Sequence, residues 1–266
     1  PSSVTSIGVS AFENSNMLSR IDLPSSITEI GKAAFASCAL TDIEVPKDVT
    51  ILSYRVFAQN PDLRRVTLPK GLKKISEGAF TACFALQTIE IPNSVEQIER
   101  CAFTQCRSLE KFSGAFATED GRALIMGDKL VAFAPYGITS YEIPHNVKIV
   151  GDTAFGSCEE LESITIPESV TSIEDGAFWW CSNLQSITIP ESVKSIGPWA
   201  FGHCSNLKSI DIPSRVTEIG ELALYNCRSL EKIEIPECVE SIGRKAFGNC
   251  DALAEITLPN SIRKMG

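Results

Sequence analysis

Ten cysteines, two histidines and several adjacent carboxylate pairs are the residues of this 266-residue chain that could do chemistry. A nucleophilic side chain needs a base within hydrogen-bond reach, and the only imidazoles belong to His145 and His203. Neither histidine lies in a recognisable catalytic motif, so we interpret both as solvent-exposed loop residues. The sequence therefore predicts no catalytic residues, and we expect a protein that is not an enzyme.

The residues that could bind a metal ion or a cofactor do not have the sequence spacing that such sites require. The pairs Glu119-Asp120, Glu159-Glu160 and Glu174-Asp175 fall in expected turns without a calcium-loop pattern. A structural zinc site would need Cys-x2-Cys pairs, which the chain does not contain. The glycines match no nucleotide-binding fingerprint. We expect neither a metal ion nor a cofactor.

The aromatic residues suggest binding rather than catalysis. Trp179, Trp180 and Trp199 are the three tryptophans of the chain, and His203 lies close to Trp199 in the sequence. Tyr225 follows Trp179 by 46 residues, which is two periods of the 23-residue repeat described below. Exposed, clustered Trp and Tyr suit a protein interface or a platform for stacking sugar rings. The alternative is that these rings cover the edges of the fold. We take the three tryptophans and Tyr225 as candidate partner-binding residues, with their exposure deciding between the alternatives.

A repeat must position all of these side chains. Prolines recur with a period of 23 residues at Pro167, Pro190, Pro213, Pro236 and Pro259. A period between about 20 and 50 residues is typical of solenoids. Within one repeat, Leu184, Ile187 and Ile189 alternate with polar residues, which predicts a short half-buried strand that ends at the proline. The following residues, 193–204, form a compact arc that returns the chain to its start.

Residues at equal positions of successive repeats form columns. Phenylalanine holds one column from Phe12 to Phe247, and eight of the ten cysteines hold another, three residues later. In stacked coils, the Cβ atoms of neighbouring column cysteines are separated by about the spacing between coils. This exceeds the ~3.5–4.5 Å Cβ–Cβ distance that a disulfide favours. Ser15 and Asn60 occupy the same column, which indicates a packing role. We therefore expect buried free thiols.

The unit L-x-x-I-x-I-P-x-S-V-x-x-I-G-x-x-A-F-x-x-C, present in residues 161–181, 184–204 and 230–250, resembles the BspA-like leucine-rich repeats of bacterial and some protist surface proteins. The resemblance implies a curved right-handed solenoid on an exported protein that adheres to host or matrix proteins. We expect one leucine-rich-repeat solenoid domain over residues 1–266, with about eleven coils including partial terminal ones. Short parallel strands should line one face, with short 3-10 or strand segments on the other and little α-helix.

One coil is enlarged. The spacing from Pro92 to Pro144 is 52 residues, which exceeds the period of 23 by 29. Apolar runs at residues 123–126 and 129–133 flank Gly127-Asp128, which predicts a β-hairpin. We interpret residues 112–140 as an enlarged coil with a hairpin insertion and not as a separate domain.

Charge and hydropathy narrow the classes of partner. A formal charge of −9 argues against nucleic acid, which needs a basic face. No apolar run reaches the 18 residues of a membrane span. The chain begins and ends inside repeats, so we expect a piece of a longer protein. We expect a monomer, and the family resemblance implies an extracellular or cell-surface location.

The outward side chains of the strands form a second candidate surface. Alternation turns Thr165, Thr188, Asp211 and Glu234 outward on a polar face of mixed charge. This face lacks aromatic residues, so a solvated surface and a broad, weak binding role are about equally supported. We expect a protein partner, host or matrix, with glycan binding at the tryptophans or a passive structural spacer as alternatives.

Overall fold

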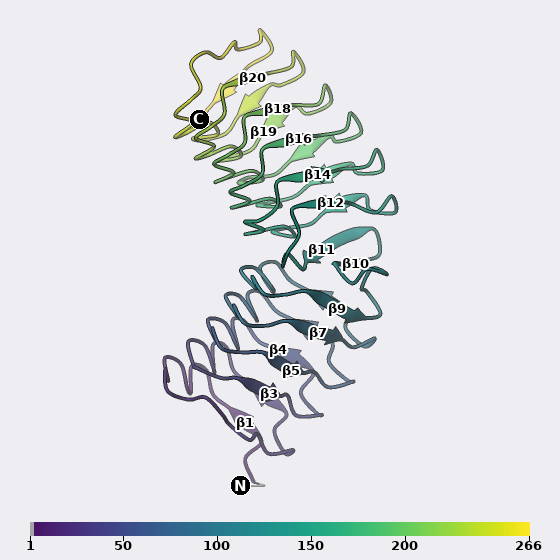
Figure 1. Ribbon diagram of the computed structural model, residues 1–266, viewed down its shortest axis with the longest axis vertical. Helices are drawn as coiled ribbons and strands as arrows, with labels where there is room; N and C mark the ends of the chain where they lie inside the picture. The colour runs from purple at the N-terminus through teal and green to yellow at the C-terminus, as the bar shows by residue number, and fades with distance from the viewer. Residues whose placement is uncertain (1–2) are drawn as a thin grey trace. The chain divides into compact units, whose positions relative to one another are not determined.

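Each repeat folds into one turn of a β-solenoid, as the period of 23 residues predicts (Figure 1). The computed structural model describes residues 3–266, which form about eleven turns and contain no helix. One turn consists of an I-x-I strand, a corner at the proline, a second short strand and an irregular return arc. The predicted leucine-rich-repeat solenoid is confirmed.

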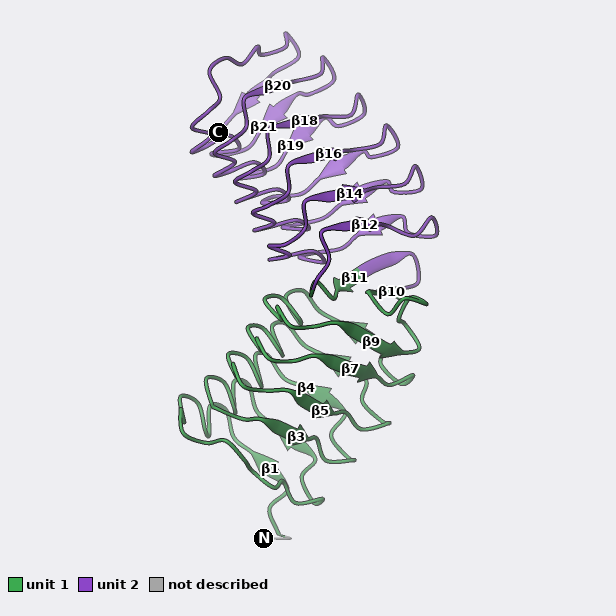
Figure 2. Cartoon of the chain, viewed as in Figure 1, with its two compact units in different colours: residues 1–125, 131–136 green, residues 126–130, 137–266 purple. Residues whose placement is uncertain are grey.

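The chain divides into two compact units, which Figure 2 colours green and purple. Unit 1 comprises residues 1–125 and 131–136, and unit 2 comprises residues 126–130 and 137–266. The division falls within the enlarged coil, where Ala123–Met126 (β10) and Lys129–Phe133 (β11) form the predicted hairpin. Gly127 has a φ of +66° in the turn, a conformation that favours glycine. A single domain over the whole chain stays a prediction.

Unit 1 contains two series of short parallel strands. The I-x-I series is Asp42–Glu44 (β3), Arg65–Thr67 (β5), Thr88–Ile91 (β7) and Lys111–Gly114 (β9). The second series is Ser6–Ile7 (β1), Glu29–Ile30 (β2), Ile51–Leu52 (β4), Lys74–Ile75 (β6) and Gln97–Ile98 (β8). Within the I-x-I series β3 pairs with β5 and β7 with β9, always in the register that the repeat imposes.

Unit 2 has the same two series in longer sheets. The I-x-I series is Ser140–Glu142 (β12), Ser163–Thr165 (β14), Ser186–Thr188 (β16), Ser209–Asp211 (β18) and Lys232–Glu234 (β20), hydrogen-bonded in that order. The second series is Ile149–Val150 (β13), Ser172–Ile173 (β15), Ser195–Ile196 (β17), Glu218–Ile219 (β19), Ser241–Ile242 (β21) and Lys264–Met265 (β22). Its first member pairs with residues 129–130 of β11.

The core lies inside the coils because each strand buries alternate residues. In β16 the central Ile187 is buried between exposed Ser186 and Thr188. The register pairs Ile164 with Ile187 and Ile187 with Ile210, so one isoleucine stacks on the next. Every coil thereby covers the apolar edge of its neighbour, which a single coil could not bury alone.

Two residues of each return arc adopt left-handed backbone. One precedes the Ala-Phe pair, as at Trp199 with φ 57°, and the other precedes the cysteine column, as at Trp180 and His203 with φ 62° and 64°. The N–H of Trp180 donates to Gly202 O at 2.8 Å in the next coil, and the N–H of His203 donates to Tyr225 O at 2.7 Å. The arcs are therefore joined by their own backbone ladder.

The glycine column serves close packing between coils instead of a left-handed turn. Gly197 and Gly220 have no left-handed φ. A Cβ at Gly197 would lie 2.7 Å from Asp175 N, and one at Gly220 would lie 2.8 Å from Pro198 N. Glycine is needed at these two positions because the preceding coil leaves no room for a side chain.

Phenylalanine rings stack along the core of each unit. In unit 2, Phe155 and Phe178 have centroids 5.2 Å apart, and Phe178 and Phe201 have centroids 5.3 Å apart with ring planes within 3°. In unit 1, the Phe35 and Phe57 centroids are 5.8 Å apart. These rings are buried and fill the interior of each coil.

The cysteine column forms a hydrogen-bonded ladder of free thiols. The Cys83 thiol donates to Phe57 O at 3.2 Å, in the preceding coil, and Cys204 donates to Phe178 O at the same distance. Asn60 takes the same position with a stronger donor, and its Nδ2 lies 2.7 Å from Phe35 O. The column thus links the coils through polar groups inside the core.

Burial should make the column thiols unreactive. Desolvation raises the pKa of the Cys83 thiol to about 12, so almost no thiolate exists at pH 8. We expect iodoacetamide to label Cys83 only after denaturation, as measured by mass spectrometry of its peptide with and without guanidinium. Rapid labelling of Cys83 in the native protein would contradict this burial.

Candidate functional site

The four predicted strand-face residues form one exposed row in unit 2. The register pairs Thr165 with Thr188 and Asp211 with Glu234 on neighbouring strands. The pairing of Ser186 with Ser209 and of Ile187 with Ile210 brings Thr188 beside Asp211. All four side chains are exposed. We call these four residues the strand row.

The strand row continues at both ends and has a parallel neighbour. Glu142 pairs with Thr165 at one end, and Thr257 pairs with Glu234 at the other. On the other side of the buried isoleucines lies a row of small hydroxyls: Ser140, Ser163, Ser186 and Ser209. Adjacent parallel strands are ~4.8 Å apart, so the surface presents hydroxyl and carboxylate oxygens at regular short intervals.

The structure also brings the predicted aromatic residues together. Trp180 stacks on His203 with centroids 4.5 Å apart and planes within 4°, and Trp199 is parallel to the same imidazole at 6.0 Å. Trp179 meets Trp180 edge to face at 5.2 Å, and Tyr225 meets Trp199 at 5.7 Å. We call these five residues the aromatic surface.

An alternation of large and absent side chains makes room for these rings. The position before Trp180 and its equivalents holds Gly156, Trp179, Gly202, Tyr225 and Gly248 in successive coils. A Cβ at Gly202 would lie 2.8 Å from Trp199 Cε3 and 3.4 Å from Trp179 Cδ1. Each large ring can therefore lean over the glycine of the next coil.

The aromatic surface is partly open to solvent. Trp180 is 40% exposed, and the side chains of the other four residues are partly buried. These rings therefore do not merely fill the interior of the coil. The exposure keeps both predicted binding roles open for the tryptophans.

The expectation that His203 is a solvent-exposed loop residue is wrong. Its imidazole packs between aromatic rings, while the His145 side chain is 82% exposed as expected. Burial, and then the positive charge of Arg228, lower the pKa of His203, so the ring is neutral at pH 7. Arg228 Nε donates to Asn226 Oδ1, which leaves Asn226 Nδ2 to donate to His203 Nδ1 at 3.0 Å. The remaining proton of the imidazole is then on Nε2.

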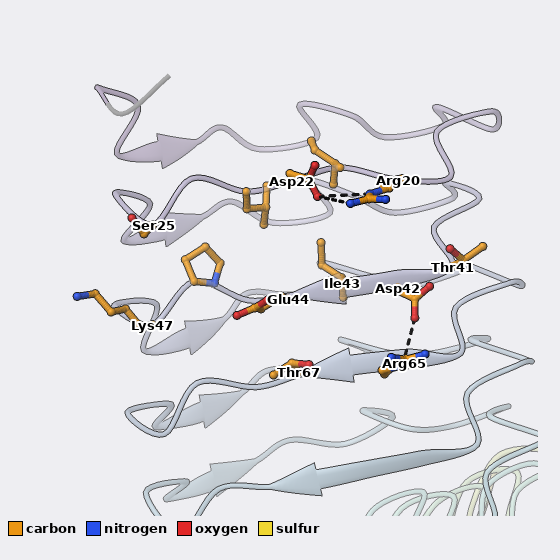
Figure 3. Close-up of a pocket in the computed structure, with 13 residues that line it drawn as sticks. Arg20, Asp22, Ser25, Thr41, Asp42, Ile43, Glu44, Lys47, Arg65 and Thr67 are labelled. Carbon is orange, nitrogen blue, oxygen red and sulfur yellow. Dashed lines mark hydrogen bonds and ion pairs between the residues drawn. The ribbon is translucent and has the colours of Figure 1, made fainter.

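Unit 1 carries an open hollow on its own strand face (Figure 3). Its volume is about 790 Å³, and it is lined by residues 20–23, 25, 41–44, 46, 47, 65 and 67. Arg20 pairs with Asp22 and Arg65 pairs with Asp42, each at 3.3 Å, as the dashed lines show. Because these opposite charges neutralise one another, the hollow is a polar, charge-balanced part of the strand face.

Ion pairs elsewhere tie neighbouring coils together. Lys74 contacts Glu99 at 2.6 Å, and the Glu99 carboxylate accepts the N–H of Glu77 at 2.9 Å. The hydrogen bond from Lys74 lowers the pKa of Glu99. Lys129 in unit 2 bridges Asp152 and Glu174 in the same manner. These groups stabilise the stacking of coils.

Residues 3–266 contain neither a metal-binding cluster nor a candidate membrane span. None of these residues forms a group of three or more His, Cys, Asp or Glu side chains placed to hold a metal ion. No helix of this part of the chain has the length and apolar character that crossing a membrane requires.

In-register parallel strands, a return arc and a buried ladder on every turn define a leucine-rich-repeat solenoid. Proteins of this class generally bind other proteins. The family model described as BspA type Leucine rich repeat region matches six copies, over residues 1–110, 129–250 and 217–266. The chain belongs to this family, which confirms the resemblance read from its repeats.

Solved structures agree with this assignment. A leucine rich cell surface protein from Faecalibacterium prausnitzii A2-165 is 31% identical with a TM-score of 0.82, over 96% of this chain and 77% of that one. A leucine-rich repeat protein from Bacteroides ovatus is 29% identical with a TM-score of 0.64, over 100% and 67%. The pneumococcal vaccine antigen PcpA, at 21% identity and a TM-score of 0.67 over 100% and 77%, supports the fold alone. A comparison with curated proteins finds no match.

Proposed function

We propose that this chain is a non-enzymatic module of an exported bacterial surface protein, and that it binds a host or matrix protein through the strand row of unit 2. The observation that carries the proposal is the alignment of Thr165, Thr188, Asp211 and Glu234 in one exposed row. The family and the cell-surface relative from F. prausnitzii support the location.

The charge of the row indicates the kind of partner. Asp211, Glu234 and the flanking Glu142 place three carboxylates along the same line. The whole chain carries a formal charge of −9. A partner with a basic surface complements this field, and such complementarity acts mainly on the rate of association.

The row is suited to a broad, weak contact. It offers hydroxyl and carboxylate oxygens without the buried aromatic anchors that dominate tight interfaces. Display of many copies on a cell surface raises the overall avidity of weak contacts. We therefore expect a single module to bind weakly and a multivalent array to adhere.

The test is binding of the module to immobilised fibronectin and fibrinogen by surface plasmon resonance. The strand row variant Asp211→Asn/Glu234→Gln should bind roughly 5- to 10-fold more weakly than wild type, mainly through slower association at low salt. The matched control Glu218→Gln/Glu237→Gln removes the same charge from exposed positions outside the row and should bind like wild type.

Two outcomes would contradict the proposal. Equal losses in both variants would show that net charge, and not the row, governs binding. No binding to either protein, even by a multivalent display of the module, would favour a passive spacer instead.

A further inference from the structure

We propose that the aromatic surface is a binding site for a neutral hexopyranose, separate from the strand row. The site consists of the exposed part of the Trp180 indole together with neutral polar side chains of the same and the following arcs. The C–H face of a pyranose ring is apolar and stacks on an indole, while its hydroxyls need hydrogen-bonding partners around the ring.

The distances between ring centroids show which face of Trp180 is open. His203 lies parallel to one face at 4.5 Å. Trp179 is 5.2 Å from Trp180 and 6.4 Å from His203. These three distances place Trp179 at roughly a right angle to the stack, beside the edge of the Trp180 ring. Trp179 therefore does not cover the face opposite His203.

The preceding coil covers only the inner part of that face. Its residues at the positions of Trp179 and Trp180 are Gly156 and Ser157, which are buried and too short to cover the outer part of the indole. The aromatic stack thus begins at Trp180, and the ring is 40% exposed. One indole face of this size accommodates one sugar ring.

Neutral polar side chains lie along the aromatic surface, with Asn183 on the coil of Trp180 and Asn226 and Asn249 on the coils beyond His203. Asn226 bonds to His203, and Asn249 Nδ2 donates to the Tyr225 hydroxyl at 2.9 Å. Asn183 and Asn206 are exposed just beyond the two arcs and pair with each other at 3.2 Å. Amides and hydroxyls both donate and accept, which matches sugar hydroxyls. His203 is neutral at pH 7, so nothing in the stack selects a charged sugar.

The expected affinity is low for one site. A hexose has few atoms and makes one stacking contact, so a dissociation constant on the order of 1 mM is expected. Weak sites of this kind become useful when many modules are displayed together.

Intrinsic fluorescence reports on this site alone, because all three tryptophans of the chain belong to it. We expect methyl β-D-galactopyranoside or methyl β-D-glucopyranoside to give a saturable change in emission. Sorbitol, which has hydroxyls but no ring, should give none. Saturation-transfer NMR should show the strongest transfer to the C–H protons of one sugar face.

The test variant is Trp180→Asn. Asparagine stands at the equivalent positions 226 and 249 with the same left-handed backbone, so the variant should fold, and an unchanged unfolding temperature would verify this. It keeps Trp179 and Trp199 as reporters but should lose saturation. The control Tyr54→Asn removes an exposed aromatic ring of unit 1 and should titrate like wild type.

Sugar binding at the aromatic surface and protein binding at the strand row can be tested separately. The strand row variant Asp211→Asn/Glu234→Gln should titrate with the sugar like wild type, and Trp180→Asn should still bind the protein partner. No saturable response to either glycoside up to about 100 times the expected dissociation constant would overturn the proposal. Loss of protein binding in Trp180→Asn without any sugar response would also overturn it, and would assign the surface to a protein.

Discussion

Replacing Phe178 with alanine should lower the free energy of unfolding by about 3–5 kcal/mol. Phe178 is fully buried and stacks between Phe155 and Phe201 at 5.2 and 5.3 Å. The substitution opens a cavity between three coils and removes two ring contacts at once. Because every coil is stabilised by its neighbours, the loss should weaken the coupling within unit 2.

Phe178→Leu is the matched control. The repeat itself places Leu224 in the phenylalanine column, where it is buried. We expect this variant to lose less than about half of what the alanine variant loses. Urea unfolding monitored by circular dichroism measures both. Equal stability of Phe178→Ala and wild type would show that the ring column does not hold the coils together.

Replacing Asn60 with leucine should destabilise unit 1 by about 3–5 kcal/mol although the position is fully buried and leucine is more apolar. Asn60 Nδ2 donates to Phe35 O at 2.7 Å and to Phe57 O at 2.9 Å, and its Oδ1 accepts from Leu40 N at 3.2 Å. Leucine would leave these backbone groups buried without partners. Each unsatisfied group costs about 1–3 kcal/mol.

Asn60→Cys is the informative comparison. Cysteine is the usual residue of this column, and its thiol donates to the carbonyl of the preceding coil at Cys83 and Cys106. We expect the cysteine variant to retain more stability than the leucine variant in urea unfolding. A leucine variant as stable as wild type would mean that the amide bonds contribute nothing net.

The fold could be predicted from the sequence because the sequence is repetitive. The proline period, the I-x-I alternation of residues such as Ile187, and the Gly127-Asp128 turn each specify local structure directly. Repetition then fixes the register, since shifting Ile187 by one residue would turn it to solvent. The same alternation predicts that Thr165, Thr188, Asp211 and Glu234 share one exposed row, as the strand pairing shows.

The backbone conformation and the packing of the return arc could not be predicted in the same way. Its left-handed positions are held in most coils by ordinary residues such as Trp199 and Thr153 and by glycine only in a few, as at Gly176, so no single residue type marks them. The packing of His203 also escaped prediction, because it depends on ring orientation across coils. One pattern could have revealed it: the alternation of Gly202 and Gly248 with Trp179 and Tyr225 predicts space for large rings.

Two surfaces with different chemistry follow from one repeat. The strand row holds only polar side chains, namely threonines and carboxylates. Each of them lies one strand spacing from the next. The arc tolerates large rings at Trp179 and Tyr225 because glycine occupies the next coil. A single solenoid scaffold can therefore present a polar row and an aromatic surface without changing its core.

Photocrosslinking from the strand row tests the central claim most directly. Benzoylphenylalanine would replace one residue in each of three variants: Thr188, Trp180, or Lys194, which is exposed and directly precedes β17 of the second strand series. Each variant would be incubated with a matrix protein that the module binds. We expect crosslinks from position 188 and none from position 194 or 180. Crosslinks from position 194 or 180 without any from position 188 would contradict the assignment of the partner to the strand row.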